Sequence, residues 1–462
     1  MKILKHTHIY SFYLWLLLVF TFIIRFAGLH YIHSSDPQKL LLGDSATYIN
    51  PARSLLYLGK FSHSPETPEI IETFRTPGYP LFLALIFRFS GNSIYAVIII
   101  QIVISVLTIY LIFRIAELLF SPFVGIAAAL FFALEHTMFY FSLIVLTETL
   151  FTFLITMSFF FGLYFFIKKK SKVFCFLTGL FTALAAMVRP AGMYIIFPLV
   201  IFFAVYSILQ RYSIRKIILI IAVLLLPWLV LIESWKLRNY IAVQHYHFSS
   251  VQGIGLLYSL GADILADKEG ISREEAIQTL QTRHAAPTNW IAASGKNFSI
   301  FGKKLILSNP HIFIRNQIIG LVRLFLISGE GTTLSLFGFH TPERGAFGDI
   351  LRLSPSQYFQ KWLIENPHFF LIFMITSAFL IFLYVMLIPA VNLIRRVSFN
   401  TPWPHLFLSV YAIYFTLTVP GLWTYYRFRT PFMGIICIYS AAGFCEIGRK
   451  YLHSRTTIGK KN

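Results

Sequence analysis

Charged side chains are scarce in this sequence, and acidic ones are the scarcest. Asp, Glu, Lys and Arg together make up 13% of the 462 residues, with 19 acidic residues against 39 basic ones. Soluble globular domains carry about 25% charged residues. With 57% hydrophobic residues and a mean hydropathy of +0.70, the chain has too little polar surface for a soluble enzyme. We therefore expect most of it to lie in a membrane.

Cysteine and nucleotide-binding motifs are scarce or missing as well. The three cysteines, Cys175, Cys437 and Cys445, lie in apolar stretches without metal-site spacing, which favours small buried core residues. There is no P-loop, dinucleotide fingerprint or internal repeat, which argues against ATP hydrolysis as an energy source. The net charge of +20 would suggest a nucleic-acid partner for a soluble protein. In a membrane protein an excess of Lys and Arg is typical of the cytoplasmic loops, so we expect no nucleic-acid partner.

Apolar stretches near 20 residues, the length that crosses the hydrocarbon core, occur about ten times. They lie at residues 9–28, 93–113, 122–141, 143–166, 173–188, 191–209, 217–234, 367–390, 404–420 and 431–447. No small-residue cleavage site follows the first stretch, so we expect a retained helix rather than a signal peptide. The sequence predicts an all-α polytopic membrane protein with a bundle of about 10 to 11 transmembrane helices.

Basic loops orient this bundle. If the N-terminus is cytoplasmic, the basic clusters all fall inside, as the positive-inside rule requires. These clusters are Arg114, residues 168–172, residues 211–216, Arg395 with Arg396, and the tail from Arg449. Residues 29–78 and 235–366 then lie outside the cytoplasm. Residues 310–328 are apolar but contain Arg315 and Arg323, so we expect an interfacial or re-entrant helix there.

Three regions follow from this topology. Residues 1–234 form an N-terminal core of seven helices with the outer loop 29–78, residues 235–366 form an extracytoplasmic region, and residues 367–462 form C-terminal helices with a basic tail. Within the outer region, residues 263–284 have the charge pattern of a short solvated amphipathic helix.

Two carboxylates at the outer side are candidates for function, because charge near hydrocarbon is costly and usually retained for use. Asp44 lies in the first outer loop, before an amphipathic stretch that ends near Gly59. Its alternative role is a helix N-cap. Glu148 lies just inside the outer end of the fourth predicted span, where a carboxylate needs a partner, a proton or a metal. Its alternative role is a hydrogen bond to a neighbouring helix.

Several arginines lie at the same side: Arg75, Arg189, Arg238, Arg427 and Arg429. Each is alternatively an anchor at the membrane interface. A guanidinium binds two phosphate oxygens at once, so the set is typical of a site for an anionic, membrane-bound substrate. Displacing phosphate from a sugar carbon needs a base on the opposite face of the sugar. The leaving phosphate needs cations rather than a strong acid.

These segments, in this order, resemble a known family. They are Gly43-Asp44, Arg75-Thr76-Pro77-Gly78-Tyr79-Pro80, Thr147-Glu148, Arg189-Pro190, Trp235 with Arg238-Asn239-Tyr240, and Arg427-Phe428-Arg429-Thr430-Pro431. The chain resembles the polytopic glycosyltransferases of the GT-C fold. More narrowly, it is similar to the bacterial relatives of the dolichyl-phosphate-mannose protein mannosyltransferases and of the aminoarabinose transferases that modify lipid A.

The resemblance implies an enzyme of the bacterial inner (plasma) membrane whose site faces the periplasm. It would move a sugar from a polyprenyl phosphate, undecaprenyl or dolichyl, to lipid A, another envelope glycan or a protein, with inversion. Asp44 is then the catalytic base, and Glu148 assists the acceptor or binds a divalent metal, Mg, Mn or Zn. The implied ligands of the donor phosphate are Arg75, Arg189, Arg427 and Arg429, and those of the substrate are Tyr48, Tyr79, Arg238, Asn239 and Tyr240.

Two other functions would also need outer arginines. One is a transporter or flippase for lipid-linked sugars, but transporters usually show internal repeats and helices broken at mid-bilayer, which the sequence does not indicate. The other is a glycan polymerase or ligase, which we would expect to use a large outer loop without the early aspartate.

Overall fold

The computed structural model describes residues 2–168, 170–284, 295–339, 354–397, 402–418 and 421–458. Helices dominate these ranges, which confirms the predicted all-α membrane class. A single small hairpin interrupts them in the first outer loop, where β1 (Ser62–Ser64) pairs antiparallel with β2 (Thr67–Ile71).

Seven helical stretches within the described residues are long and apolar enough to cross a membrane. They are α1 (Lys2–Ser35), α4 (Ile94–Leu119), α7 (Glu148–Ile167), η2 (Pro190–Ile195) with α9 (Ile196–Leu209), α10 (Ile214–Trp228) continued by η3 (Leu229–Glu233) and α11 (Ser234–Val243), α20 (Pro367–Val397) and α22 (Thr430–Ile458). Shorter apolar helices are α3 (Gly78–Ser90) and α8 (Lys172–Val188), and α21 (Trp403–Leu417) has 15 residues.

Two further stretches are bent pairs of helices. The first is α5 (Pro122–Leu134) with α6 (His136–Ser142), bent by 63°, and the second is α16 (Pro310–Leu326) with α17 (Glu330–Leu336), bent by 55°. The second bend agrees with either a broken span or a re-entrant loop. The interfacial or re-entrant helix expected at 310–328 therefore stays a prediction.

The first bend divides the helix predicted at 122–141 into two, which agrees with either a broken span or a re-entrant loop. Glu135 leaves the helical conformation, and its carboxylate accepts the backbone N–H of Met138, so it caps a new helix. The span predicted from residue 143 begins at Glu148 instead. The backbone of Val145 binds the first outer loop: its N–H donates to the carbonyl of Leu40, and its carbonyl accepts the hydroxyl of Ser45. The cap at Glu135 is local, whereas the bonds of Val145 are tertiary contacts, which an apolar sequence does not reveal.

Three other helical segments differ from the sequence-based expectation. The seventh predicted span, 217–234, continues without interruption to Val243 through the π-helical turn η3, so the predicted boundary at 234 falls inside one helix. The helix predicted at 263–284 is two, α13 (Ala262–Glu269) and α14 (Arg273–Arg283), because Gly270 turns the chain at a φ of +67°. Helix α3 has no counterpart among the predicted spans.

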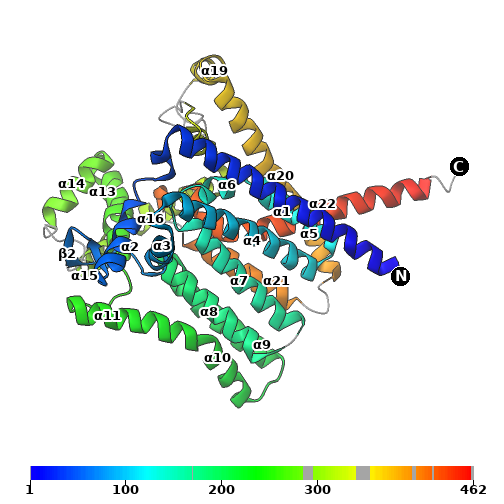
Figure 1. The fold of residues 1–462 in the computed structure, drawn as a ribbon, viewed down its shortest axis with the longest axis horizontal. Coiled ribbons are helices and arrows are strands. Elements are labelled where there is room, and N and C mark those ends of the chain that lie inside the picture. The colour runs from blue at the N-terminus through cyan, green and yellow to red at the C-terminus, as the bar shows by residue number, and fades with distance from the viewer. Residues whose placement is uncertain are drawn as a thin grey trace.

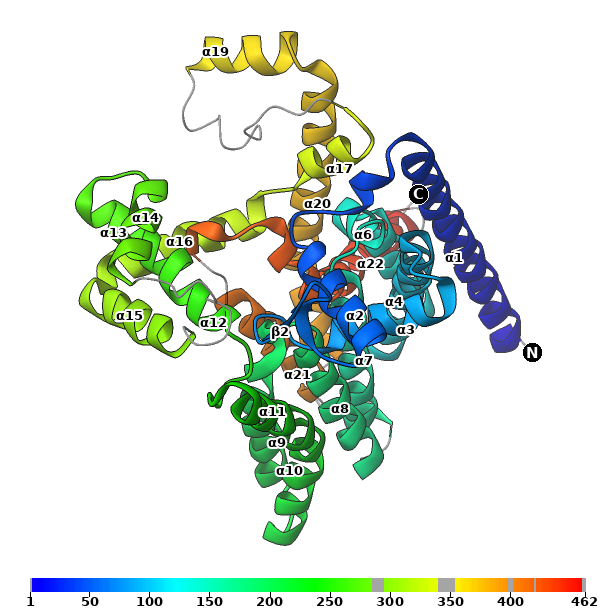
Figure 2. The ribbon, with the colours of Figure 1, turned by 60° about the vertical axis from the view of Figure 1, so that its left-hand side comes forward.

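The elements that we expect outside the cytoplasm gather at one end of the helical bundle. Figure 1 shows α2 (Ala46–Leu58), α13, α14 and α15 (Gly295–Ser308) at this end, while α1 begins toward the other end. The remaining short elements are η1 (Pro37–Leu40), α12 (Val251–Ile254), η4 (Gly255–Gly261), η6 (Gly421–Trp423) and η7 (Tyr426–Phe428). Figure 2 shows α19 (Pro355–Phe359) and the start of α20, after η5 (Gln360–Ile364), projecting from the bundle.

Close packing inside the bundle depends on small residues, as in other membrane proteins. Helix α7 packs against α4 and α8, and α22 packs against α5 and α20. At Gly179 a β-carbon would lie 2.0 Å from the carbonyl oxygen of Leu224, and at Gly443 it would lie 1.8 Å from that of Met386. Only glycine allows α8 to approach α10, and α22 to approach α20, this closely.

Candidate active site

Asp44 binds two arginines and does not cap a helix. It precedes Ser45, the N-cap residue of α2, and no side chain caps that helix. The Oδ1 atom of Asp44 lies 2.9 Å from Nη2 of Arg75, and its Oδ2 atom lies 3.4 Å from Nη1 of Arg427. The side chain is 41% exposed, so the carboxylate is also open to a substrate.

Arg75 is held by the helix that follows Asp44. Its Nε donates to Oγ1 of Thr47 at 2.9 Å and its Nη1 donates to the hydroxyl of Tyr48 at 2.8 Å. The guanidinium also lies over the rings of Tyr48 and Phe74, with centroid distances of 4.3 and 4.6 Å. The segment before α3 thus brings Arg75 to the Asp44 loop in a fixed orientation.

Glu148 is buried at the start of α7 and binds two arginines as well. Its Oε1 atom lies 2.8 Å from Nη1 of Arg189 and 3.1 Å from Nε of Arg427. Arg427 therefore contacts both carboxylates, from the short η7 turn before the last helix. We call Asp44, Glu148, Arg75, Arg189 and Arg427 the arginine–carboxylate cluster; its formal charge is +1.

The cluster changes the acidity of Asp44. Partial burial raises the pKa of its carboxyl, but the charges of Arg75 and Arg427 outweigh this effect, so its pKa lies below the ordinary value. Burial lowers the pKa of Arg427, but Glu148 and Asp44 more than reverse this, so its pKa lies above the ordinary value. Asp44 is therefore ionised and Arg427 charged at neutral pH.

The structure does not bring Arg429 into the cluster. Its side chain is 1% exposed and donates from Nη1 to the carbonyl of Leu324 at 2.6 Å and to that of Ile327 at 3.3 Å. Its Nη2 lies 3.9 Å from Oε1 of buried Glu135. Arg429 thus connects α16 and the break between α5 and α6 to the start of α22. Its N–H donors face protein groups rather than the cluster.

The predicted substrate ligands fall into two groups. Tyr48 borders the cluster through its bond to Arg75, and buried Tyr79 stands behind it, edge-on at 5.3 Å, with its hydroxyl donating to Gln101. Arg238 and Asn239 bind backbone carbonyls of the outer loops instead. Arg238 donates to those of Glu72 and Phe61, and Asn239 to that of His247. Tyr240 is 47% exposed on α11.

Two residues near the cluster are not singled out by the sequence. Thr47 accepts the Nε–H of Arg75. Glu72 is buried, and its carboxylate accepts the backbone N–H groups of Phe74 and Arg75. A glutamate before a turn is too common a pattern to indicate such a role.

The cluster does not fit the divalent metal predicted at Glu148. Within the described ranges, no group of three or more His, Cys, Asp and Glu side chains could hold a metal ion. The position between Asp44 and Glu148 is taken by the guanidinium of Arg427, and each carboxylate has a second arginine. A divalent cation placed there would meet three positive charges at short range.

Part of the chain is similar in sequence to a known family, and the whole chain is similar in fold to solved structures. Residues 74–235 match the family model of dolichyl-phosphate-mannose-protein mannosyltransferases. This segment contains Arg75, Glu148 and Arg189. No curated protein sequence matches the chain.

Two solved structures of an archaeal oligosaccharyltransferase have a similar fold. AglB from Archaeoglobus fulgidus, in complex with an inhibitory peptide and a dolichol-phosphate, matches with a TM-score of 0.50 and 14% identity over 98% of this chain and 52% of that one. The Archaeoglobus fulgidus oligosaccharyltransferase in complex with Zn and sulfate matches with a TM-score of 0.50 and 14% identity over 96% and 50%. The chain thus spans about half the length of these proteins.

A more distant likeness is to ArnT from Cupriavidus metallidurans bound to undecaprenyl phosphate. It has 13% identity over 94% of this chain and 77% of that one, with a TM-score of 0.40. The match over residues 74–235 and the shared fold confirm the predicted resemblance: the chain has the fold of these polytopic membrane proteins, and this segment is similar to the dolichyl-phosphate-mannose-protein mannosyltransferases.

Proposed function

We propose that the protein is a glycosyltransferase that moves a sugar from a polyprenyl phosphate to an acceptor outside the cytoplasm, such as lipid A, another envelope glycan or a protein. The observation that carries this proposal is the bridge by Arg427 between Asp44 and Glu148. It puts a partly exposed carboxylate beside a surplus of guanidinium groups. The family match over residues 74–235 supports the proposal, as does the dolichol-phosphate bound by the archaeal neighbour.

In this reaction Asp44 is the base. The acceptor hydroxyl attacks the anomeric carbon while its proton passes to the carboxylate of Asp44. The bond from that carbon to the phosphate oxygen breaks, and the polyprenyl phosphate leaves with the electron pair. Attack from the face opposite the phosphate inverts the configuration. Arg75, Arg189 and Arg427 stabilise the charge that grows on the phosphate, so no strong acid is needed.

Donor binding also makes Asp44 a better base. In the free protein, Arg75 and Arg427 hold the pKa of Asp44 below its ordinary value, which makes the carboxylate a weak proton acceptor. A donor phosphate competes with Asp44 for both guanidinium groups. As their hold on Asp44 weakens, its pKa rises toward the value that proton transfer requires.

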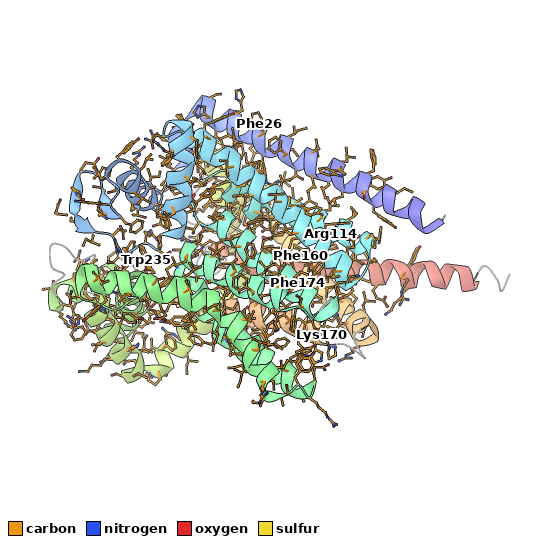
Figure 3. All side chains as sticks on the ribbon, turned by 60° about the horizontal axis from the view of Figure 1, so that its bottom comes forward. Phe26, Arg114, Phe160, Lys170, Phe174 and Trp235 are labelled. Atoms are coloured by element: carbon orange, nitrogen blue, oxygen red, sulfur yellow. The ribbon has the colours of Figure 1, made fainter. Side chains whose placement is uncertain are left out.

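The site faces the periplasm if the basic loops are cytoplasmic, as we propose for a bacterial inner membrane. Figure 3 supports this orientation, because Arg114 and Lys170, from the predicted cytoplasmic loops, lie toward one end of the bundle and Trp235 lies toward the other. The cluster lies at the same end of the bundle as Trp235, because Arg238, on the same helix as Trp235, contacts the carbonyl of Glu72 near the cluster.

A transfer assay tests the function. Purified protein in vesicles is given polyprenyl phosphates carrying different labelled sugars, together with envelope lipid, glycan or protein acceptors. We expect label to pass from one donor to an acceptor at a rate above that of vesicles without protein. Movement of the labelled donor across the bilayer without transfer would instead identify a flippase and overturn the proposal.

A further inference from the structure

Glu72 is a buried carboxylate three residues before Arg75 of the arginine–carboxylate cluster. Its side chain is 1% exposed. The Oε1 atom accepts the backbone N–H of Phe74 at 2.5 Å and that of Arg75 at 2.8 Å, and Oε2 lies 3.4 Å from Nδ1 of His63. Two successive backbone N–H groups thus share one buried carboxylate oxygen, which fixes the backbone of this turn.

The same turn is held from the other side by the outer region. Arg238 donates to the carbonyl of Glu72 at 2.8 Å, and the hydroxyl of Ser249 donates to that of Phe74 at 2.6 Å. Ser250 donates its backbone N–H to the carbonyl of Thr73 at 2.9 Å. These contacts hold the carbonyl groups of the turn, whereas Glu72 holds the N–H groups, including the one on Arg75 itself.

We propose that Glu72 is a positioning residue, whose carboxylate fixes the backbone from which Arg75 reaches Asp44. The guanidinium of Arg75 meets Thr47, Tyr48 and Asp44 through three different nitrogens, each at 2.8 to 2.9 Å. Such a three-point contact tolerates little movement of the residue that carries it. A displacement of about 1 Å at a reacting group can lower a rate by about 100-fold.

His63 completes the arrangement on the outer surface. The hydrogen bond to Glu72 raises the pKa of His63 above its ordinary value despite partial burial. Its ring thus contacts the Oε2 atom of Glu72, while the Oε1 atom accepts both backbone N–H groups. Glu72 acts on the cluster through Arg75, and its own oxygens face His63 and the backbone of the turn.

A double-variant cycle tests this role; its kinetic part rests on the proposed function. We expect Glu72→Ala to lower kcat by about 10- to 100-fold. In the Arg75→Ala background the same change should alter kcat by less than about twofold, because the residue through which Glu72 acts is gone. Glu72→Gln keeps an acceptor oxygen and should retain activity within about fivefold of the wild type. Glu69→Ala, on the exposed face of β2, is the matched control.

Hydrogen–deuterium exchange gives a second measurement that does not depend on turnover. Glu72→Ala should speed exchange at the amides of Phe74 and Arg75 by at least tenfold relative to Glu69→Ala, with the helices unchanged. Unchanged exchange at these amides would overturn the proposal, as would losses of kcat that multiply in the double variant or a Gln variant as impaired as Ala. Wild-type protein inactive with every donor would count against the proposed function, and the exchange result would still decide the role of Glu72.

Discussion

The guanidinium of Arg427 lies 3.4 Å from the carboxylate of Asp44, although 383 residues separate them in the sequence. The same guanidinium lies 3.1 Å from Glu148. The first outer loop, the start of α7 and the turn before α22 therefore meet at one side chain. The cluster is complete only when the N-terminal and C-terminal parts of the chain are packed together. The chemistry proposed for the cluster therefore depends on correct packing of the bundle around Arg427.

The neighbouring arginines Arg427 and Arg429 should respond differently to substitution. Arg427→Lys keeps a charge but cannot reach both carboxylates with two nitrogens, so the transfer rate should fall by about tenfold or more while thermal stability changes little. Arg429→Ala should lower the free energy of unfolding by about 3 kcal/mol, because it leaves Glu135 buried without its partner. Transfer rates and thermal unfolding in detergent measure the two effects. A stable Arg429→Ala protein that fails only in donor binding would show that Arg429 binds the donor phosphate, as the sequence predicts.

Metal removal should not affect transfer. Arg427 stands between the two carboxylates and supplies the positive charge that a divalent ion would bring. We expect the rate in excess EDTA to stay within about twofold of the untreated rate, and added Mg²⁺, Mn²⁺ or Zn²⁺ not to raise it. Loss of activity in EDTA that one of these ions restores would show that a metal takes the place of Arg427 during the reaction.

The pH dependence of kcat/KM reports on Asp44 in the free protein. The Asp44 pKa lies below its ordinary value of 3.8 because Arg75 and Arg427 outweigh its burial. Activity should therefore persist as the pH falls toward 3.8 and be lost only below it. In Arg427→Gln one of the two cations that lower the pKa of Asp44 is gone. The pKa of Asp44 should then rise, and the acid limb of the residual activity should move to higher pH. Arg283→Gln, on exposed α14, should leave it in place; an acid limb at the same pH in all three proteins would contradict the account.

Cysteine labelling tests the orientation of the membrane protein. Glu66 lies at the tip of the exposed β-hairpin, Ser356 in exposed α19 and Lys172 at the start of α8. An impermeant thiol reagent added outside should modify cysteines at the first two positions but not at Lys172. Modification of Glu66→Cys and Lys172→Cys from the same side would overturn the orientation. Modification of Ser356→Cys only from inside would show that α16 and α17 together span the membrane.

Much of the cluster can be predicted from the sequence, because ionised groups near hydrocarbon are few and the charged loops fix which side each faces. Asp44, Glu148, Arg75, Arg189 and Arg427 all follow from that reasoning, and the structure brings them together. Their roles in catalysis stay predictions.

The sequence does not separate Arg427 from Arg429, because both stand in the same turn. One guanidinium faces the outer loop and the other the inside of the bundle, and only the packing of α16 decides which. The break at Glu135 is hidden for a similar reason. An apolar stretch is equally suited to one helix or two, and here the capping carboxylate of Glu135 and the bonds of the Val145 backbone to the first outer loop interrupt the helical run.

The most direct measurement of the central claim is the transfer rate of Asp44→Asn against wild type in the same vesicles. Asparagine keeps the size of the side chain but cannot take the acceptor's proton, so we expect the rate to fall by at least about 100-fold in a folded, inserted protein. Asp36→Asn, which replaces the cap of η1 in the same outer loop, is the control and should retain activity. An Asp44→Asn protein that transfers sugar at the wild-type rate would contradict the assignment of Asp44 as the base.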